Sequence, residues 1–253
     1  MPALPSVLRL VSWNLAHQCR PDPISPAFAR ALSLLEPDVL ALNEFVDGPG
    51  RQALRQDLHA LGLVHVAVSE RLNGHNQVLV ASRLPFVLGE LSGPESPDRG
   101  GESNFLHVSF TVLDLDFVGL RAPAYESRPL AAYWLLLRET VRANIDKPIV
   151  FMGDLNTDPQ QSRRASAKHL QSMIADGWTV PVPEGPWSFV SRSGQTTRID
   201  HAIVSPLLQV VAARYVCQSG DLLLAGPSRK SAISDHAPLV LDIRVPPGKP
   251  TTA

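Results

Sequence analysis

The sequence predicts an α/β fold in which two mixed β-sheets pack as a two-layer β-sandwich flanked by helices. Three observations support this class. The 253 residues are 44% hydrophobic and 19% charged, an ordinary globular composition that can fill a sizeable core. Short apolar runs alternate with helical segments over much of the chain, whereas its middle contains consecutive strand-like runs. This mixture of strand–helix units and β-meander is typical of partly antiparallel sheets covered by helices.

The N-terminal part predicts two strands, each followed by a helix. Residues 8–13 form an apolar strand, and Ser25 can cap a helix whose first turn accommodates Pro26. Residues 39–42 are a short apolar run of the kind found in buried strands. The helix after them is expected to end at Gly62.

The rest of the chain continues the mixture of strands and helices, without repeats or an internal linker. The further predicted elements are strands at residues 77–82, 104–111 and 115–120, a helix at 130–145, a strand at 149–152, a helix at 162–175, and strands at 199–204, 209–216 and 239–243. We expect one domain over residues 1–245 and a loose tail over residues 246–253, which are rich in proline.

The charge balance argues against a dedicated nucleic-acid binder with a strongly basic surface throughout. The formal net charge is -1, whereas dedicated nucleic-acid binders usually carry a large basic excess. A polyanionic substrate would therefore have to meet a local patch. The sequence has neither a signal-peptide pattern nor the roughly 20 consecutive apolar residues of a membrane helix, so we expect a cytoplasmic protein. We further expect a monomer without an obligate protein partner.

Polar residues of catalytic types follow several of the predicted strands, or lie beside them. In layered α/β folds such strand ends are where sites are assembled. One acidic residue after one strand would be ordinary loop chemistry, but six such positions in one chain favour a shared site. These residues are Asn14, Glu44, Arg121, Asp154 with Asn156, Asp200 with His201, and Asp235 with His236.

These residue types suit metal-dependent hydrolysis of a phosphodiester. A hard cation such as Mg²⁺ prefers oxygen ligands, which Glu44, Asp235 and the amide of Asn14 can supply. A further carboxylate, Asp154, can orient or deprotonate the attacking water. Charge on the phosphoryl oxygens requires preorganised donors. The candidate donors are His236, Asn156, Asn14 and Arg121, and Asp200 can hold the second ring nitrogen of His236.

Two aromatic residues are further candidates for contact with substrate. Trp187 and Tyr125 could stack on a base or a lipid, although an aromatic residue in an alternating strand more often serves packing. His201, beside Asp200, is more simply explained as bracing the site than as a direct participant, and His75-Asn76 could line the cleft.

Five segments resemble the successive motifs of the endonuclease/exonuclease/phosphatase family, which has the deoxyribonuclease-I-like fold. A Gly-Asp-x-Asn segment alone would be weak evidence, whereas all five motifs in the family's order between residues 12 and 236 are specific. The segments are Ser12-Trp13-Asn14, Asn43-Glu44, Gly153-Asp154-Leu155-Asn156, Arg198-Ile199-Asp200-His201 and Ser234-Asp235-His236.

The resemblance implies a role for each matched residue and a requirement for Mg²⁺ or Mn²⁺. Glu44 would be the main metal ligand, with Asn14 and Asp235 near the ion. Asp154 would align the attacking water. Asn156 and His236 would contact the phosphate, with His236 oriented by Asp200.

Three positions depart from the family pattern. Asn43 stands where the family commonly has glutamine, and Arg121 stands where many members have a histidine or tyrosine that contacts phosphate. Arginine itself donates strong hydrogen bonds to phosphate, so Arg121 remains a candidate site residue. Ala16 stands where the abasic-site repair branch often has an aspartate, which weakens an assignment to that branch.

The favoured function is a divalent-metal-dependent phosphodiester hydrolase, in particular an endonuclease that uses an aspartate-positioned water. The alternative is a phosphodiesterase or phosphatase acting on a small-molecule or lipid phosphate ester. A non-catalytic binding protein on the same fold is a third hypothesis, and the presence of every catalytic residue type argues against it. The sequence has no Gly-x-Ser-x-Gly elbow, no zinc-ligand spacing and no P-loop.

Overall fold

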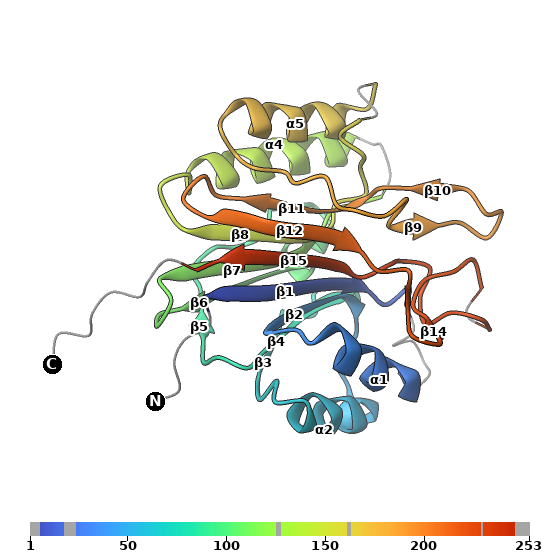
Figure 1. The fold of residues 1–253 in the computed structure, drawn as a ribbon. Helices are drawn as coiled ribbons and strands as arrows, with labels where there is room; N and C mark the ends of the chain where they lie inside the picture. The colour runs from blue at the N-terminus through green and yellow to red at the C-terminus, as the bar shows by residue number, and fades with distance from the viewer. Residues whose placement is uncertain (1–5, 18–23, 125–127, 161–162, 229, 246–253) are drawn as a thin grey trace, which may run out of the picture.

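Two mixed β-sheets stack face to face in the computed structural model, which describes residues 6–17, 24–124, 128–160, 163–228 and 230–245 (Figure 1). The first sheet consists of β1 (Val7–Asn14), β2 (Val39–Phe45), β3 (His65–Val68), β4 (Gln77–Ser82), β12 (Gln209–Tyr215) and β15 (Leu239–Arg244), in the order β12-β15-β1-β2-β4-β3. The second consists of β5 (Val87–Leu88), β6 (Phe105–Phe110), β7 (Leu115–Arg121), β8 (Ile149–Asp154) and β11 (Asp200–Val204), in the order β11-β8-β7-β6-β5.

Side-chain alternation along the strands creates the sandwich. In β1, Leu8 and Leu10 face the core between the sheets, whereas Val11 and Trp13 belong to the cluster on the outer face. The inner faces of both sheets are apolar, so stacking them removes a large area from water. Gly119 in β7 permits this approach, because a Cβ atom there would lie 2.9 Å from Cγ1 of Val78 in the opposite sheet.

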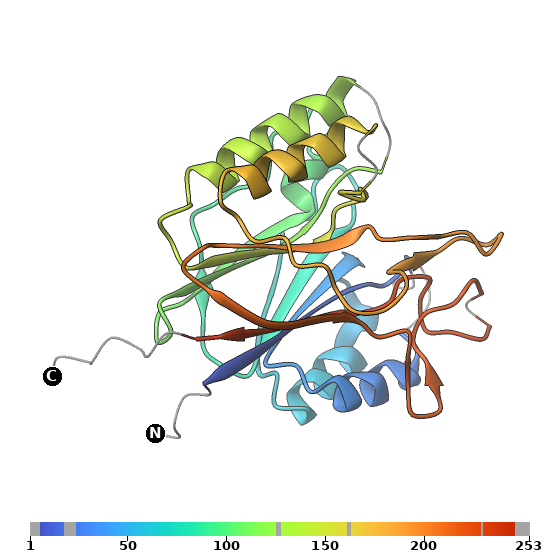
Figure 2. The same ribbon diagram turned by 45° about the horizontal axis from the view of Figure 1, so that its top comes forward.

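Helices cover the outer faces of both sheets, which gives four layers (Figure 2). Helices α1 (Pro26–Leu35) and α2 (Gln52–Ala60) lie on the first sheet, and α4 (Arg128–Arg142) and α5 (Ala165–Ala175) lie on the second. The smaller elements are η1 (Pro49–Arg51), α3 (Gly100–Ser103) and the ribbons β9 (Phe189–Val190) with β10 (Thr196–Thr197) and β13 (Gln218–Ser219) with β14 (Leu222–Leu223).

The expected α/β sandwich of mixed sheets is confirmed, and the local signals explain several boundaries. The Ser25 hydroxyl accepts the backbone N–H of Ala27 and so caps α1, and Gly62, with φ +82°, follows the end of α2. Strand β3 was not expected from the sequence. Its four residues are all half-buried, so it lacks the alternation that marks a strand exposed on one face.

Two predicted helices have different ends in the structure. Helix α4 begins at Arg128 and ends at Arg142, three residues earlier than predicted, where the side chain of Asn144 donates to the Thr140 carbonyl. Helix α5 begins at Ala165 instead of residue 162, because Arg164 is extended (φ −80°, ψ 138°); residue 162 itself lies outside the described residues, as does the predicted tail. Among the described residues, no helix combines the length and apolarity that crossing a membrane requires.

Candidate active site

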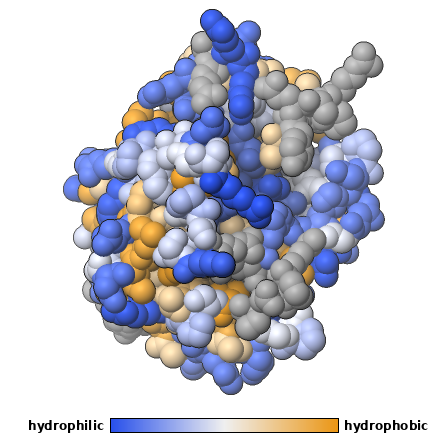
Figure 3. All heavy atoms as spheres, turned by 90° about the vertical axis from the view of Figure 1, so that its right-hand side faces the viewer, coloured by the Kyte–Doolittle hydropathy of each residue, from blue (hydrophilic) through white to orange (hydrophobic). Residues whose placement is uncertain are grey.

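Six strands bring their polar ends to one end of the sandwich. Strands β1, β2, β7 and β8 finish there and β11 and β15 start there, at the right of Figure 1. Parallel pairing of β7 with β8 sets Arg121 opposite Asp154, and antiparallel pairing of β11 with β8 sets Asp200 opposite Asp154. Figure 3 turns this end toward the viewer and shows hydrophilic residues, in blue, over much of its upper half.

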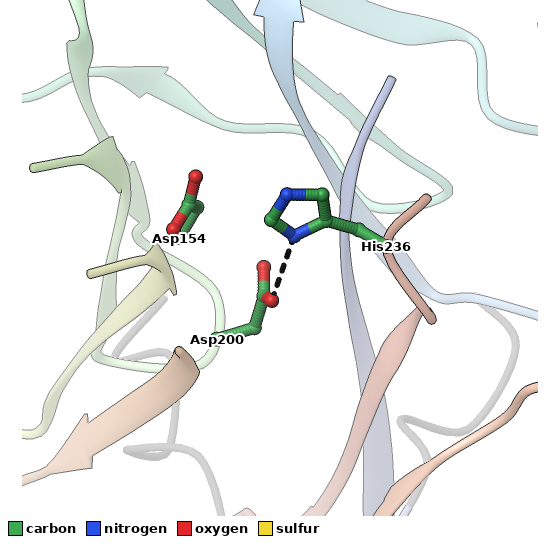
Figure 4. Close-up of side chains that lie close together, drawn as sticks. All are labelled: Asp154, Asp200 and His236. Carbon is green, nitrogen blue, oxygen red and sulfur yellow. Dashed lines mark hydrogen bonds and ion pairs between the residues drawn. The ribbon is translucent and has the colours of Figure 1, made fainter. Parts of the chain in front are cut away.

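Asp154, Asp200 and His236 form a buried cluster at this end (Figure 4). One ligand atom from each lies within 4.8 Å of the others, and Nδ1 of His236 is 2.9 Å from Oδ2 of Asp200. None of the three residues is more than 6% exposed. The structure therefore brings together residues that are 82 positions apart in the sequence, from 154 to 236.

The backbone around His236 is fixed by hydrogen bonds to the end of β1. Nε1 of Trp13 donates to the His236 carbonyl at 2.8 Å. The Ser234 hydroxyl donates to the Asn14 carbonyl and accepts the N–H of His236. The ring of Phe189 lies against the imidazole, with 4.9 Å between centroids. The imidazole is thus held by packing as well as by Asp200, which preorganises it.

The protonated form of His236 is stabilised by its surroundings. Burial alone would lower the pKa of this imidazole, but the Asp200 carboxylate and the further negative charges of Asp154 and Asp235 raise it to about 9. Asp200 is held in turn by Tyr215, whose hydroxyl donates to the Asp200 carbonyl at 2.7 Å. His236 can therefore present a positively charged N–H donor at neutral pH.

Asp154 sits among several donors. Nδ2 of Asn14 donates to Oδ2 at 2.9 Å, the N–H of Asn156 donates to Oδ1 at 3.0 Å, and Nε of Arg121 lies 3.5 Å from Oδ2. Burial, together with the negative charges of Asp200 and Glu44, raises the pKa of the carboxyl to about 6 against the opposing charges of His236 and Arg121. A carboxylate whose pKa lies near neutrality is suited to accepting a proton from water.

Glu44 is positioned by a strained backbone and two basic side chains. It has φ +57°, within the irregular pairing of β2 with β4 between Leu42 and Phe45. Nη2 of Arg121 is 3.0 Å from Oε1, and Nδ1 of His17 is 3.1 Å from Oε2. A left-handed conformation in a residue other than glycine is costly, and such strain concentrates at functional sites.

The residues at this end fit a divalent cation. Four carboxylates, those of Glu44, Asp154, Asp200 and the half-buried Asp235, outnumber the cationic side chains Arg121 and His236. Oδ1 of Asp200 is buried and has no hydrogen-bond partner among the described residues. Carboxylate and amide oxygens are the ligands that Mg²⁺ and Mn²⁺ prefer, and excess buried negative charge favours binding of a cation.

Most of the residues selected from the sequence meet at this site. Those brought together are Asn14, Glu44, Arg121, Asp154, Asn156, Asp200 and His236, with Asp235 next in sequence. Asn156, with φ +50°, points its amide to the Ala122 carbonyl at 2.8 Å.

Two of the other candidates lie outside this cluster. His201 is buried, with Nε2 2.9 Å from the carbonyls of Thr157 and Arg198, which fits bracing of the loop after β8. Trp187 packs against the core between the sheets, and it is the ring of Phe189 that lies against the imidazole of His236. Tyr125 lies outside the described residues.

Neither His17 nor Phe189 was expected at this site from the sequence. His17 follows a strand end closely, but the left-handed turn that brings it to Glu44 has no glycine or asparagine to indicate it. Phe189 lies two residues from Trp187 in the sequence, and only the register of the ribbon shows which of the two aromatic residues reaches His236.

Comparison with known proteins finds structures of the same architecture. The endonuclease/exonuclease/phosphatase from Beutenbergia cavernae is 23% identical, with a TM-score of 0.68 over 95% of this chain and 72% of that chain. An AP endonuclease from Archaeoglobus fulgidus is 18% identical, with a TM-score of 0.68 over 92% of this chain and 98% of that chain. A 3′ phosphatase from Neisseria, bound to a product DNA hairpin, is 19% identical, with a TM-score of 0.64 over 92% and 98% of the two chains.

At these identities the solved structures show a shared fold. A sequence search of curated proteins found no match. The model of the endonuclease/exonuclease/phosphatase family, however, matches residues 11–236, which include every residue of the cluster around Asp154. The chain belongs to the endonuclease/exonuclease/phosphatase family.

Proposed function

We propose that the protein is a divalent-metal-dependent phosphodiester hydrolase that acts on nucleic acid. The observation that carries the proposal is the buried arrangement of His236, held by Asp200 at 2.9 Å, beside the carboxylate of Asp154. These surroundings favour the protonated imidazole and raise the pKa of Asp154 to about 6. A positively charged donor next to a proton acceptor is what attack of water on a phosphate diester requires.

In this proposal each side chain has one task. Asp154 orients the attacking water and accepts its proton, because its carboxylate is ionised at neutral pH and belongs to the buried cluster with Asp200 and His236. His236 donates a hydrogen bond to a phosphoryl oxygen and keeps its orientation through Asp200. Asn156 and Arg121 supply further donors as negative charge accumulates on the phosphate.

Glu44, Asn14 and Asp235 would hold the cation. When bound, Mg²⁺ or Mn²⁺ polarises the phosphoryl oxygen and offsets the charge of the carboxylates. Glu44 is well placed for this task because its Oε1 pairs with Arg121, while its Oε2 faces the side chain of His17, which is partly exposed to solvent. Asn14 is fixed by its bond to Asp154 and by the N–H of Ala16, which donates to its Oδ1.

Nucleic acid is the favoured substrate because two structures of the same fold are described as an AP endonuclease and as a 3′ phosphatase bound to DNA. A small-molecule or lipid phosphate ester is the second candidate, since the net charge of -1 gives no overall attraction for a polyanion.

A substrate panel tests the proposal. The protein is incubated with plasmid DNA, a duplex with an abasic site, a 3′-phosphorylated oligonucleotide, RNA, phosphoinositide vesicles and an aryl phosphodiester, each with Mg²⁺, with Mn²⁺ and with EDTA. We expect metal-dependent hydrolysis of at least one DNA substrate. Turnover of only the lipid or the small ester would favour the second candidate, and no turnover of any substrate would contradict the proposal.

A matched pair of variants connects that activity to the site. Asp154→Asn removes the proton acceptor, whereas Asp146→Asn makes the same change at an exposed position beyond α4. We expect the first to be inactive and the second to match the wild type. Equal activity of the two variants would overturn the assignment of Asp154.

A further inference from the structure

The chain turns sharply after β1, and this turn brings His17 back over Glu44. Ala16 and His17 are consecutive residues in the left-handed region, with φ values of +52° and +58°. Neither is glycine or asparagine, so both conformations are costly and must be held by surrounding contacts. Glu44, which His17 meets, is left-handed as well. Strain thus accumulates on both sides of one contact, as it does at ligand sites.

The ring nitrogen of His17 at this contact has two incompatible neighbours. Nδ1 lies 3.1 Å from Oε2 of Glu44, which can only accept a hydrogen bond, and 3.0 Å from Nδ2 of Asn76, which can only donate one. An imidazole nitrogen carries either a hydrogen or a lone pair. Neither tautomer of His17 therefore satisfies both neighbours.

The amide of Asn76 shows a related mismatch. This residue is 8% exposed, and its Oδ1 has no hydrogen-bond partner among the described residues. A half-turn of the amide would exchange its oxygen and nitrogen. Oδ1 would then face Nδ1 of His17, so that a carboxylate oxygen and an amide oxygen, both with lone pairs, would face one imidazole nitrogen.

We propose that His17 and Asn76 join Glu44 as further ligands of the divalent cation, which binds on the Oε2 side of Glu44. The inference rests on the proposed function only in that it uses the same cation. Neighbouring ligands of an octahedral ion, with bonds of ~2.1 Å, lie ~3 Å apart. The separations of 3.1 Å and 3.0 Å around Nδ1 match that spacing. Arg121 occupies Oε1, which leaves Oε2 for the ion.

An imidazole ligand alters which metal the site prefers. Mg²⁺ favours ligand sets made of oxygen, whereas affinity for a nitrogen-containing set increases along the first-row series that begins with Mn²⁺. His17 therefore makes the site bind Mn²⁺ more tightly than Mg²⁺. The side chain of His17 is 55% exposed, so the ion can reach it from solvent.

Pulsed electron paramagnetic resonance of bound Mn²⁺ detects such a ligand directly, because an imidazole nitrogen bound to Mn²⁺ modulates the electron spin echo. The full-length protein is loaded with Mn²⁺ alone, without substrate. We expect nitrogen modulation in the wild type and its loss in His17→Ala. His59→Ala, at an exposed position on α2, should retain it. Mn²⁺ affinity, measured from the signal of free Mn²⁺, should fall at least about tenfold in His17→Ala and less in the control, while Mg²⁺ affinity changes little.

Absence of nitrogen modulation in the wild type would overturn the inference. So would modulation that persists in His17→Ala and disappears in His236→Ala, because the nitrogen ligand would then be His236. Thermal unfolding in EDTA checks that each variant is folded. Nitrogen ligation without hydrolysis of any substrate would support His17 as a ligand and reject the proposed function. Metal-dependent hydrolysis without nitrogen ligation would support the proposed function and reject His17 as a ligand.

Discussion

Replacing Asp154 with asparagine is expected to raise the stability of the protein at neutral pH while it removes activity. Burial raises the pKa of the Asp154 carboxyl from 3.8 to about 6 in the folded chain. Ionisation therefore favours the unfolded state. The contribution of this carboxyl to stability is fully present below pH 3.8 and is lost as pH rises through 6. Asparagine stays neutral and avoids the loss.

The shift sets the size of the effect. At about 1.36 kcal/mol per pKa unit, a rise of the pKa from 3.8 to about 6 lowers the free energy of unfolding by about 3 kcal/mol above pH 6. Asparagine gives back part of this gain, because its amide cannot accept from Asn14 and Asn156 and also face Arg121 as a carboxylate does. We expect a net gain of about 1–3 kcal/mol at pH 7.5, decreasing as the pH approaches 4.

Urea unfolding in EDTA measures this difference. The free energies of unfolding of wild type, Asp154→Asn and the surface control Asp146→Asn are compared at pH 4.5 and pH 7.5, so that titrations common to all three cancel. The control should stay within about 0.5 kcal/mol of the wild type. A loss of stability in Asp154→Asn at pH 7.5, or a difference that does not change with pH, would show that ionisation of buried Asp154 does not destabilise the fold.

Three further results are expected. kcat/KM should rise with pH as Asp154 ionises, and this rise should occur at or below pH 6 because a bound cation favours the carboxylate. It should fall above about pH 9 as His236 loses its proton. A flat profile between pH 5 and 10 would contradict these roles. Asp200→Asn should move the alkaline limb to lower pH and reduce kcat by about 10²-fold, and an unchanged alkaline limb would reject the Asp200–His236 pair. Gly153→Ala should destabilise the fold by more than about 2 kcal/mol in urea unfolding, because the new Cβ would overlap the carbonyl oxygen of Leu120; wild-type stability would contradict that geometry.

The architecture was predictable because it depends on patterns that are local in the sequence. Alternation and short apolar runs identified the central strands, and Ser25 and Gly62 marked helix ends through their own chemistry. Strand β3 was missed because its burial does not alternate, and the end of α4 was misplaced because the apolar period continues to Ile145 beyond the last helical residue.

The site was predictable in its residue types and less so in its contacts. Asn14, Glu44 and Asp154 lie at or near the ends of strands, and parallel pairing brings such positions to one edge. His236 reaches the same edge because it precedes β15, which runs antiparallel to β1. The pairing of Arg121 with Glu44 joins the two sheets, so it depends on how the sheets stack. The contact of His17 with Glu44 depends on the left-handed conformations of Ala16 and His17, which the residue types alanine and histidine do not predict.

Metal-dependent turnover by matched variants shows whether Asp154 and His236 form a hydrolytic site. Hydrolysis of a labelled abasic-site duplex and of an aryl phosphodiester is followed with Mn²⁺ for wild type, Asp154→Asn and His236→Ala, each repeated in EDTA. The account predicts hydrolysis by the wild type that EDTA abolishes, and a loss of at least about 10²-fold in each variant. Wild-type rates in both variants, or hydrolysis that EDTA leaves unchanged, would contradict a metal-dependent phosphoesterase site built on Asp154 and His236.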